Sequence, residues 1–303
     1  MDVKQMEYIV KIAEENNITR AAEKLYITQS ALNQQLLKLE RELGTELFHR
    51  SRTDWHPTEA GEIYLETARE MLAMKKNAYN RIYDLSNRKK GFLSIGFTPN
   101  RGSTMFSSVY PEFHRKYPNV IVEPTEMSVS RQTEQIEAHQ LDIGFVTLQE
   151  KNKKSGLIYE SIRLEEIFLA VPSVLDFSSC THTAPKRRFP VLPLKALTDQ
   201  PFVCIYKEST IRGITDVLFR NAGFKPDILF ETSRTSTILT MIRSGLCCGL
   251  IPGYYVNPSD PDITFFCLPE HPEWEISACF CRSSYLSSAA KEFISLAKEF
   301  WNK

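Results

Sequence analysis

Apolar residues recur at helical spacing in the N-terminal part of the chain. One set lies three or four residues apart and predicts an amphipathic helix that ends at the turn Asn16-Asn17: Val3, Met6, Val10 and Ala13. A second, shorter helix is expected to start at Thr19, a capping residue, and to include Leu25. The dipeptide Tyr26-Ile27 is expected to form the turn before a third helix.

The third predicted helix carries a clear two-faced pattern. Thr28 occupies an N-cap position and Gly44 a C-terminal cap position. Four leucines fall within about 60° of one another on one face: Leu32, Leu36, Leu39 and Leu43. The opposite face is polar and mostly uncharged: Ser30, Asn33, Gln34, Leu37 and Arg41. Asn and Gln side chains on such a face can pair bidentately with adenine. In addition, two short helices joined by a tight turn are typical of a DNA-binding helix-turn-helix. An ordinary solvated helix face is the alternative.

Residues 46–58 predict a β-ribbon, or wing, with a polar and basic tip. Apolar residues anchor both ends of this segment, and Arg50 and Arg52 lie toward the tip. Arginines in such a wing are candidates to contact DNA phosphates or the minor groove. The alternative is that they are ordinary surface arginines.

A long helix is predicted from the cap Thr58 to about Asn87. At 1.5 Å per residue it is a rod of about 45 Å. Its apolar positions alternate in spacings of four and three, which is a heptad seam with one lysine break: Tyr64, Ala68, Met71, Lys75, Ala78, Ile82 and Leu85. The seam predicts pairing with another chain, and packing on the rest of the same chain is the alternative.

The chain changes character near residues 88–91. Of its 16 prolines, only Pro57 precedes residue 91. Beyond this boundary, strand-like runs alternate with helical segments, which predicts an α/β fold with a parallel sheet covered on both faces. The predicted strands are 92–97, 120–123, 142–146, 202–206, 228–231 and 249–252.

Ligands of open α/β sheets bind beyond the carboxyl ends of strands, beside helix N-termini. This rule selects a candidate ligand-binding set: Thr98, Pro99, Arg101, Ser103, Thr147, Ser209, Thr210 and Ser233. A cation at Arg101, beside a helix N-terminus, suits a carboxylate ligand. A surface salt bridge is the alternative for this arginine.

Composition narrows the class of protein. The 303 residues carry 37 Lys and Arg against 37 Asp and Glu, so bulk charge gives no argument for nucleic-acid binding. No apolar run is long enough to span a membrane, and the charged N-terminus is not a signal peptide. Seven cysteines, an odd number, fit reduced thiols in the cytoplasm.

Motifs of enzymes and metal sites are missing from the sequence. There is no Gly-x-Ser-x-Gly elbow, no His-Glu-x-x-His and no phosphate-binding loop. A group of Cys267, His271, Cys279 and Cys281 does not have a known zinc spacing. We therefore expect no catalytic activity, no metal and no cofactor.

Residues 1–90 resemble the DNA-binding and linker region of LysR-type transcriptional regulators. The resemblance is carried by residues 21–25 (AAEKL), 28–32 (TQSAL), 39–44 (LERELG), 47–50 (LFHR) and 58–61 (TEAG). The rear resembles the effector domain of the family more loosely, through residues 111–113 (PEF), 117–118 (YP), 141–144 (LDIG) and 245–252 (GLCCGLIP). Together the resemblance covers nearly the whole chain.

The resemblance implies a winged helix-turn-helix at 1–58, a dimerising linker helix at 59–90 and an effector-binding domain at 91–303. That domain is expected to have two Rossmann-like subdomains of the periplasmic-binding-protein type, about 91–165 plus 267–303 and 166–266. The protein would be a sequence-specific regulator that binds double-stranded DNA and a small-molecule effector, as a homodimer or homotetramer. The alternative is a ligand-binding module, or an enzyme on a binding-protein fold, that does not bind DNA.

The resemblance also implies roles for single residues. The expected DNA contacts are Thr28, Gln29, Ser30, Asn33, Gln34, Lys38, Arg50 and Arg52. The family usually has a serine and a basic residue where this chain has Asn33 and Gln34, and often a basic residue at Leu37, so the target sequence is left open. One branch of the family senses peroxide through cysteines, but the matching positions here are Thr210 and Phe219.

Overall fold

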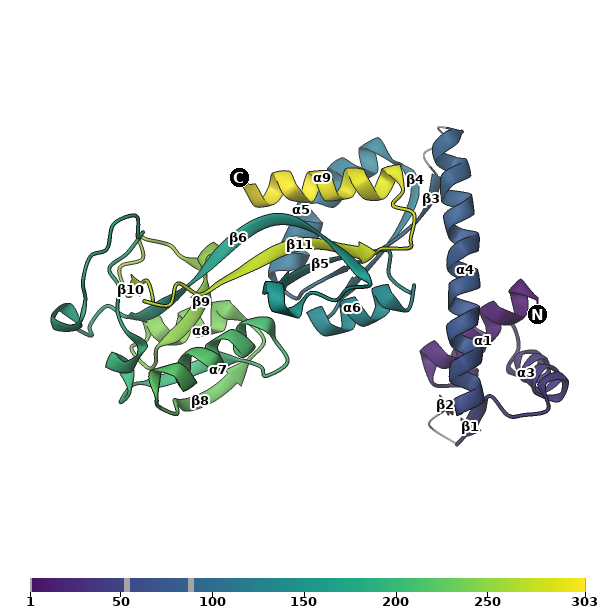
Figure 1. Ribbon diagram of the computed structural model, residues 1–303, viewed down its shortest axis with the longest axis horizontal. Helices are drawn as coiled ribbons and strands as arrows, with labels where there is room; N and C mark the ends of the chain where they lie inside the picture. Colours follow the sequence, from purple (N-terminus) through teal and green to yellow (C-terminus); the bar gives the residue numbers. More distant parts are fainter. Residues whose placement is uncertain (1, 52–54, 87–89, 303) are drawn as a thin grey trace.

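The computed structural model describes residues 2–51, 55–86 and 90–302. The chain forms a helical N-terminal domain, one long helix and an elongated α/β part made of two subdomains (Figure 1). Across the described ranges, no helix combines the length and apolar character that a membrane span needs. The fold class predicted for the chain is thus observed, with the corrections given below.

The N-terminal domain has three helices and a two-stranded ribbon: α1 (Val3–Glu15), α2 (Ile18–Lys24), α3 (Gln29–Leu43), β1 (Phe48–Arg50) and β2 (Trp55–Pro57). The ribbon is antiparallel and pairs Phe48 with Pro57, as predicted for the wing. Leu32, Leu36 and Leu39 are buried in the domain core. Leu43 was expected in the same stripe but is 48% exposed, because it is the last residue before the helix stops at Gly44.

Helix α4 (Glu59–Leu85) begins inside the N-terminal domain and ends against the α/β part (Figure 1). Thr58 caps it by accepting a hydrogen bond from the Gly61 N–H at 3.0 Å. Tyr64, Leu65 and Ala68 are buried in the N-terminal core. The first two positions of the predicted heptad seam, Tyr64 and Ala68, therefore belong to the core of their own domain.

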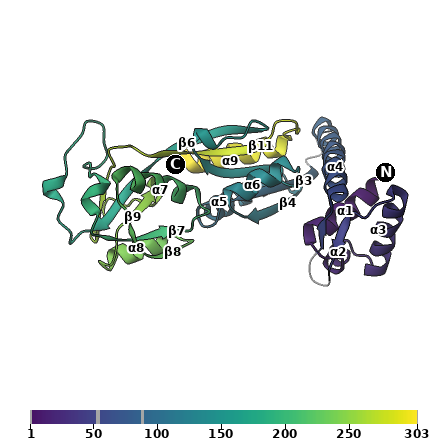
Figure 2. The same cartoon turned by 60° about the horizontal axis from the view of Figure 1, so that its bottom comes forward.

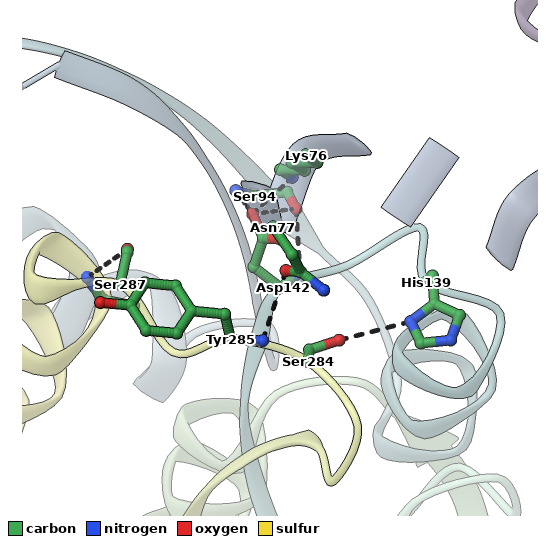
Figure 3. A network of polar contacts seen from close by, with 9 residues as sticks. Lys76, Asn77, Ser94, His139, Asp142, Ser284, Tyr285 and Ser287 are labelled. Atoms are coloured by element: carbon green, nitrogen blue, oxygen red, sulfur yellow. Dashed lines mark hydrogen bonds and ion pairs between the residues drawn. The ribbon is translucent and has the colours of Figure 1, made fainter. Parts of the chain in front are cut away.

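The second half of α4 binds the first subdomain of the same chain through polar contacts (Figure 3). The Lys76 ammonium contacts the Asp142 carboxylate at 2.7 Å, and the Asn77 side-chain oxygen accepts the Tyr285 N–H at 3.3 Å. Asp84 accepts hydrogen bonds from the Tyr285 hydroxyl at 2.9 Å and the Ser288 N–H at 2.8 Å. This face of α4 therefore packs on the rest of its own chain, which was the alternative to pairing with another chain.

The remaining seam residues of α4 point the other way. Met71, Ile82 and Leu85 are 43%, 58% and 89% exposed. At about 100° per residue, their mean direction lies about 150° from that of the residues bound to the first subdomain. Helix α4 thus has one face bound within the chain and a second, largely apolar face that stays exposed among the residues that the structure describes.

Both subdomains contain parallel strands followed by helices. The first has β3 (Lys90–Phe97), α5 (Arg101–Lys116), β4 (Asn119–Glu126), α6 (Val129–Glu137) and β5 (Ile143–Leu148), with β3 parallel to β4 and β5. The second has β7 (Pro201–Ile205), α7 (Thr210–Ala222), β8 (Asp227–Thr232), α8 (Thr235–Arg243) and β9 (Gly249–Pro252), with β7 parallel to β8. The strands match the six predicted strand segments closely.

The expectation of a purely parallel sheet is wrong. The strands β6 (Leu157–Pro172) and β11 (Glu273–Cys281) pair antiparallel with each other and run through both subdomains (Figures 1 and 2). Strand β11 is also antiparallel to β5, and β6 to β9 and β10 (Ile263–Phe266). Charged residues in the first half of β6 hid it from a search for buried strands.

The other elements lie around this frame. The C-terminal helix α9 (Ser288–Asn302) packs on α5 and shares its core, which includes Phe113 and Phe293. Short 3₁₀ helices lie at η1 (Glu150–Asn152), η2 (Ser178–Cys180), η3 (Leu194–Leu197) and η4 (Gly253–Tyr255). A separate core in the second subdomain includes Phe202 and Phe219.

Candidate DNA-binding surface and effector cavity

The start of α3 presents polar side chains to solvent. Thr28 is the N-cap, and its hydroxyl oxygen accepts the Ala31 N–H at 3.2 Å and lies 3.1 Å from the Ser30 hydroxyl. Thr28, Gln29 and Ser30 are all exposed. The N-terminal end of a recognition helix is the part that contacts base edges, so these residues lie where the sequence placed them.

The same face continues along α3. Gln34 and Lys38 are exposed, whereas Asn33 and Leu37 are half-buried. The face lies opposite the leucines that anchor the helix in the domain core. The helix therefore offers a mostly polar surface, interrupted by Leu37, with one lysine, Lys38, in its second half.

Arg50, one of the residues expected to contact DNA, also binds within the domain. Its guanidinium is paired with the Glu40 carboxylate and lies 5.8 Å from the centroid of the Trp55 ring. Glu40 is buried, and its second oxygen accepts the Leu47 N–H at 2.9 Å. The ion pair fixes the wing to α3, and Arg52, the other arginine expected in the wing, lies outside the described residues.

Glu40 was not recognised from the sequence, although the signal was present. It lies four residues after Leu36 and one after Leu39, at the edge of the buried leucine stripe. A carboxylate beside an apolar stripe needs a charged or hydrogen-bonding partner. In the structure that partner is Arg50, ten residues further along the chain.

A close backbone contact joins the wing to α4. A Cβ atom at Gly61 would lie 2.0 Å from the Leu47 carbonyl oxygen. That same oxygen accepts the Thr58 N–H at 2.9 Å, and the Thr58 hydroxyl donates to the Glu46 carbonyl at 2.7 Å. Only glycine allows α4 to start this close to the wing.

A cavity of about 250 Å³ lies between the two subdomains. Its walls come from loops at the carboxyl ends of strands and from the starts of α5, α6, α7 and α8. Seven of the eight residues predicted for the ligand site line it: Thr98, Pro99, Arg101, Thr147, Ser209, Thr210 and Ser233. Ser103 does not, because its hydroxyl is bound to the Glu126 carboxylate on the side of α5.

Two of the four helices around the cavity begin without a side-chain cap. Ser128 and Ser209 cap α6 and α7 through the Arg131 and Arg212 N–H groups, but α5 and α8 have no such hydrogen bond. Uncapped N-termini present free N–H groups and a partial positive charge. The starts of α5 and α8 are joined by the Asn100 amide, which donates to the Ser233 carbonyl at 3.2 Å.

The Arg101 charge is already paired. Its guanidinium binds the Glu165 carboxylate on β6, and the two side chains are only 8% and 6% exposed. Its central carbon lies 4.5 Å from the Trp301 ring centroid and 5.0 Å from that of Tyr254. The alternative of a salt bridge is therefore observed, but the bridge is buried and lies beside the cavity.

Glu165 joins several elements at this point. One of its oxygens accepts the indole N–H of Trp274, and the other accepts the Tyr254 N–H, each at 2.7 Å. Trp274 lies opposite Glu165 on β11 and also lines the cavity. The cluster around Glu165 thus connects α5, the paired strands β6 and β11, and η4 of the second subdomain.

Other cavity residues were not predicted. Ser128 and Val129 follow β4, and Tyr206 and Glu208 follow β7, so the strand-end rule could have selected them. Tyr255 and Trp274 belong to η4 and β11, two elements that the sequence pattern did not show. Their apolar rings cover one part of a wall that is otherwise rich in hydroxyl groups.

The buried cysteines are unreactive by position. Six of the seven are buried, and only Cys180 is exposed. Burial raises the pKa of Cys204 and Cys247 to about 11, and that of Cys248 and Cys279 to about 12. Among the residues that the structure describes, no three His, Cys, Asp or Glu side chains form a group able to hold a metal ion.

The chain matches two sequence families and many known regulators. Residues 3–62 match the "Bacterial regulatory helix-turn-helix protein, lysR family", and residues 86–302 match the "LysR substrate binding domain". It is 27% identical over 311 residues to the uncharacterized regulator YcgK of Bacillus subtilis, covering 99% of this chain and 94% of YcgK. It is 29% identical over 269 residues to the regulator XapR of Escherichia coli, covering 87% and 86%.

Solved structures share the fold over the full length. A full-length OxyR variant from Pseudomonas aeruginosa superposes with a TM-score of 0.72 at 20% identity, covering 98% of both chains. CbnR bound to its target DNA gives 0.56 at 21% identity, covering 99% of both. At 20% identity the likeness to OxyR is one of fold. The protein belongs to the LysR family of DNA-binding transcriptional regulators with an effector-binding domain.

Proposed function

We propose that α3 reads the target DNA with the exposed face that begins at its N-terminus. Thr28, Gln29 and Ser30 contact base edges or nearby phosphates, and Gln34 and Lys38 extend the contact along the helix. Arg50 acts indirectly, because its pairing with Glu40 holds the wing in place. Support comes from the exposed, polar start of a helix whose opposite face is anchored in the core, and from CbnR, which has this fold and is bound to its target DNA.

This assignment is tested by measuring the DNA affinity of two variants. Gln29→Ala is expected to lose about 1–3 kcal/mol on the target sequence and little on random DNA, because it removes a base contact. Lys38→Ala is expected to weaken binding to the target sequence and to random DNA alike, and to lower the slope of log affinity against log salt by about one. Equal losses on both duplexes for Gln29→Ala would contradict base reading by this residue.

We further propose that the cavity between the subdomains binds the effector. The observation that carries this proposal is the convergence of seven predicted strand-end residues on one cavity of about 250 Å³. An anionic group, for which a carboxylate is the candidate, is bound by the free N–H groups at the starts of α5 and α8. The Arg101 guanidinium does not bind it directly, since Glu165 already neutralises that charge.

Binding at the cavity is tested with small carboxylates. Thermal melting of the full chain in acetate, pyruvate and benzoate is compared with melting in the matching uncharged amides. A carboxylate that fits raises the melting temperature more than its amide, and Thr147→Phe, which fills the cavity, removes the rise without changing DNA affinity. Equal effects of acid and amide would contradict an anion site.

We infer that the protein forms a homodimer through α4, and that two dimers can join as a tetramer. Support comes from Met71, Ile82 and Leu85, apolar residues that the chain leaves exposed on the face opposite its own first subdomain. Effector binding would act by favouring one arrangement of the subdomains, to which α4 is fixed by Lys76 and Asp84. The protein acts where the DNA lies, which we take to be the cytoplasm.

A further inference from the structure

Tyr26 occupies an unfavourable backbone position in the turn between α2 and α3. Its φ angle is +55°. Its N–H donates to the Glu23 carbonyl at 3.1 Å, and the N–H of Ile27 donates to the Ala22 carbonyl at 3.1 Å. This pair of bonds is a Schellman motif, in which Tyr26 takes the left-handed position that glycine, or sometimes asparagine, normally fills. A side chain with a Cβ atom costs stability there.

The tyrosine side chain gains nothing from the fold in return. It is 96% exposed. Within the part of the chain that the structure describes, its ring and hydroxyl contact no partner, whereas the neighbouring Ile27 packs against the domain core. The fold therefore holds the turn firmly and projects a large aromatic side chain from it into solvent.

The position of this side chain relates it to the DNA surface. Tyr26 precedes the N-cap of α3 by two residues, and the exposed Gln29 and Ser30 follow directly. In a helix-turn-helix, the first helix crosses the DNA backbone and the second enters the major groove by its N-terminus. The turn between them therefore lies beside the phosphates that border the groove.

We propose that Tyr26 contacts the DNA backbone, with its hydroxyl donating a hydrogen bond to a phosphate oxygen. Tyrosine is one of the side chains that make such contacts, and a bond to a charged oxygen is stronger than one between neutral groups. The proposal rests on the DNA-binding function of the family and adds a residue that the sequence assigned only to a turn. It also accounts for a tyrosine where the backbone favours glycine.

The test uses the full chain and separates the hydroxyl group from the backbone strain. Tyr26→Phe removes the hydroxyl alone, Tyr26→Gly removes the side chain and the strain together, and Tyr79→Phe, at a partly exposed tyrosine of α4, is the matched control. Affinity is measured by fluorescence anisotropy on two labelled duplexes. One carries the DNA directly upstream of this protein's own gene, and the other has a random sequence.

Tyr26→Phe is expected to weaken binding about tenfold on both duplexes, because a phosphate contact does not depend on sequence. The slope of log affinity against log salt is expected to stay at the wild-type value, since tyrosine carries no charge, whereas Lys38→Ala lowers that slope by about one. Tyr26→Gly is expected to bind at least as weakly as Tyr26→Phe while melting at a higher temperature than the wild type. Tyr79→Phe should match the wild type in both measurements.

Wild-type affinity in Tyr26→Phe would overturn the proposal, and this is also the result expected if Tyr26 instead bound another protein. A lower melting temperature in Tyr26→Gly would overturn it too, because the tyrosine would then serve the fold. These outcomes are distinct from failure of the DNA-reading surface itself. If Gln29→Ala loses target affinity and Tyr26→Phe does not, the surface is retained and only the tyrosine contact is excluded.

Discussion

The ion pair between Arg101 and Glu165 offers a sharp energetic test of the effector-binding domain. Both side chains are buried, and the Glu165 carboxylate accepts three hydrogen bonds, from Arg101, Trp274 and the Tyr254 N–H. In Glu165→Ala the guanidinium would stay buried without its partner, and two further donors would lose their acceptor. Removing one partner of a buried pair costs about 3–5 kcal/mol, a large part of the roughly 5–15 kcal/mol that stabilises a domain.

The partner variant is expected to cost less. In Arg101→Met the Glu165 carboxylate keeps the Trp274 and Tyr254 donors, so we expect a loss of about 2 kcal/mol. In the double variant no unpaired guanidinium remains, and its loss should fall short of the sum of the two single losses by about 2 kcal/mol. The shortfall measures the coupling between the two charges.

Unfolding of the full chain in urea, followed by tryptophan fluorescence, provides the assay. Two of the three tryptophans, Trp274 and Trp301, lie in this cluster and report its loss directly. The free energies follow from linear extrapolation to water. A loss below about 1 kcal/mol for Glu165→Ala, or additive losses in the double variant, would refute the view that this pair joins the subdomains.

The further predictions concern other parts of the chain. In the same urea titration, Gly61→Ala should destabilise the N-terminal domain by about 2 kcal/mol or more, because its Cβ would meet the Leu47 carbonyl oxygen. Gly213→Ala on α7 is the control. It has open space around it and should be neutral or stabilising. Between pH 9 and 11 the free energy of unfolding should fall, because thiols such as Cys248 stay protonated in the folded protein while the same thiols ionise near pH 9 in the unfolded chain. Ellman's reagent at pH 8 should modify only Cys180 while the protein is folded. Rapid modification of further thiols would contradict their burial. Ile82→Glu should shift the protein toward monomers in analytical ultracentrifugation without unfolding it, and an unchanged mass would exclude the exposed face of α4 as the dimer contact.

Local signals predicted the parts of the fold that depend on local physics. Helix α3 starts at its cap Thr28 and stops at Gly44 as expected, since both ends are decided by neighbouring residues. Most of the cavity could also be predicted, because helix starts such as those at Ser209 and Thr98–Arg101 follow buried strands, and a parallel sheet brings strand ends together. The division of the chain at residues 58 and 90 stays a prediction.

Interactions between distant residues could not be predicted from such patterns. Arg101 pairs with a carboxylate 64 residues away on β6, a strand whose charged residues concealed it. Trp274 enters the cavity from β11, which was also unrecognised. Arg50 was expected to contact DNA because it lies in the predicted basic wing. Its pairing with Glu40 becomes visible only in the folded structure.

The central claim is that the chain is a sequence-specific DNA-binding regulator that reads its target with α3. The most direct measurement is fluorescence anisotropy across a salt series, with the DNA upstream of the protein's own gene and a shuffled copy, for the wild type and Gln29→Ala. We expect the wild type to prefer the native fragment, with affinity that falls as salt rises, and Gln29→Ala to lose about 1–3 kcal/mol of that preference. Equal affinity of the wild type for both fragments, or an unchanged preference in Gln29→Ala, would contradict the account.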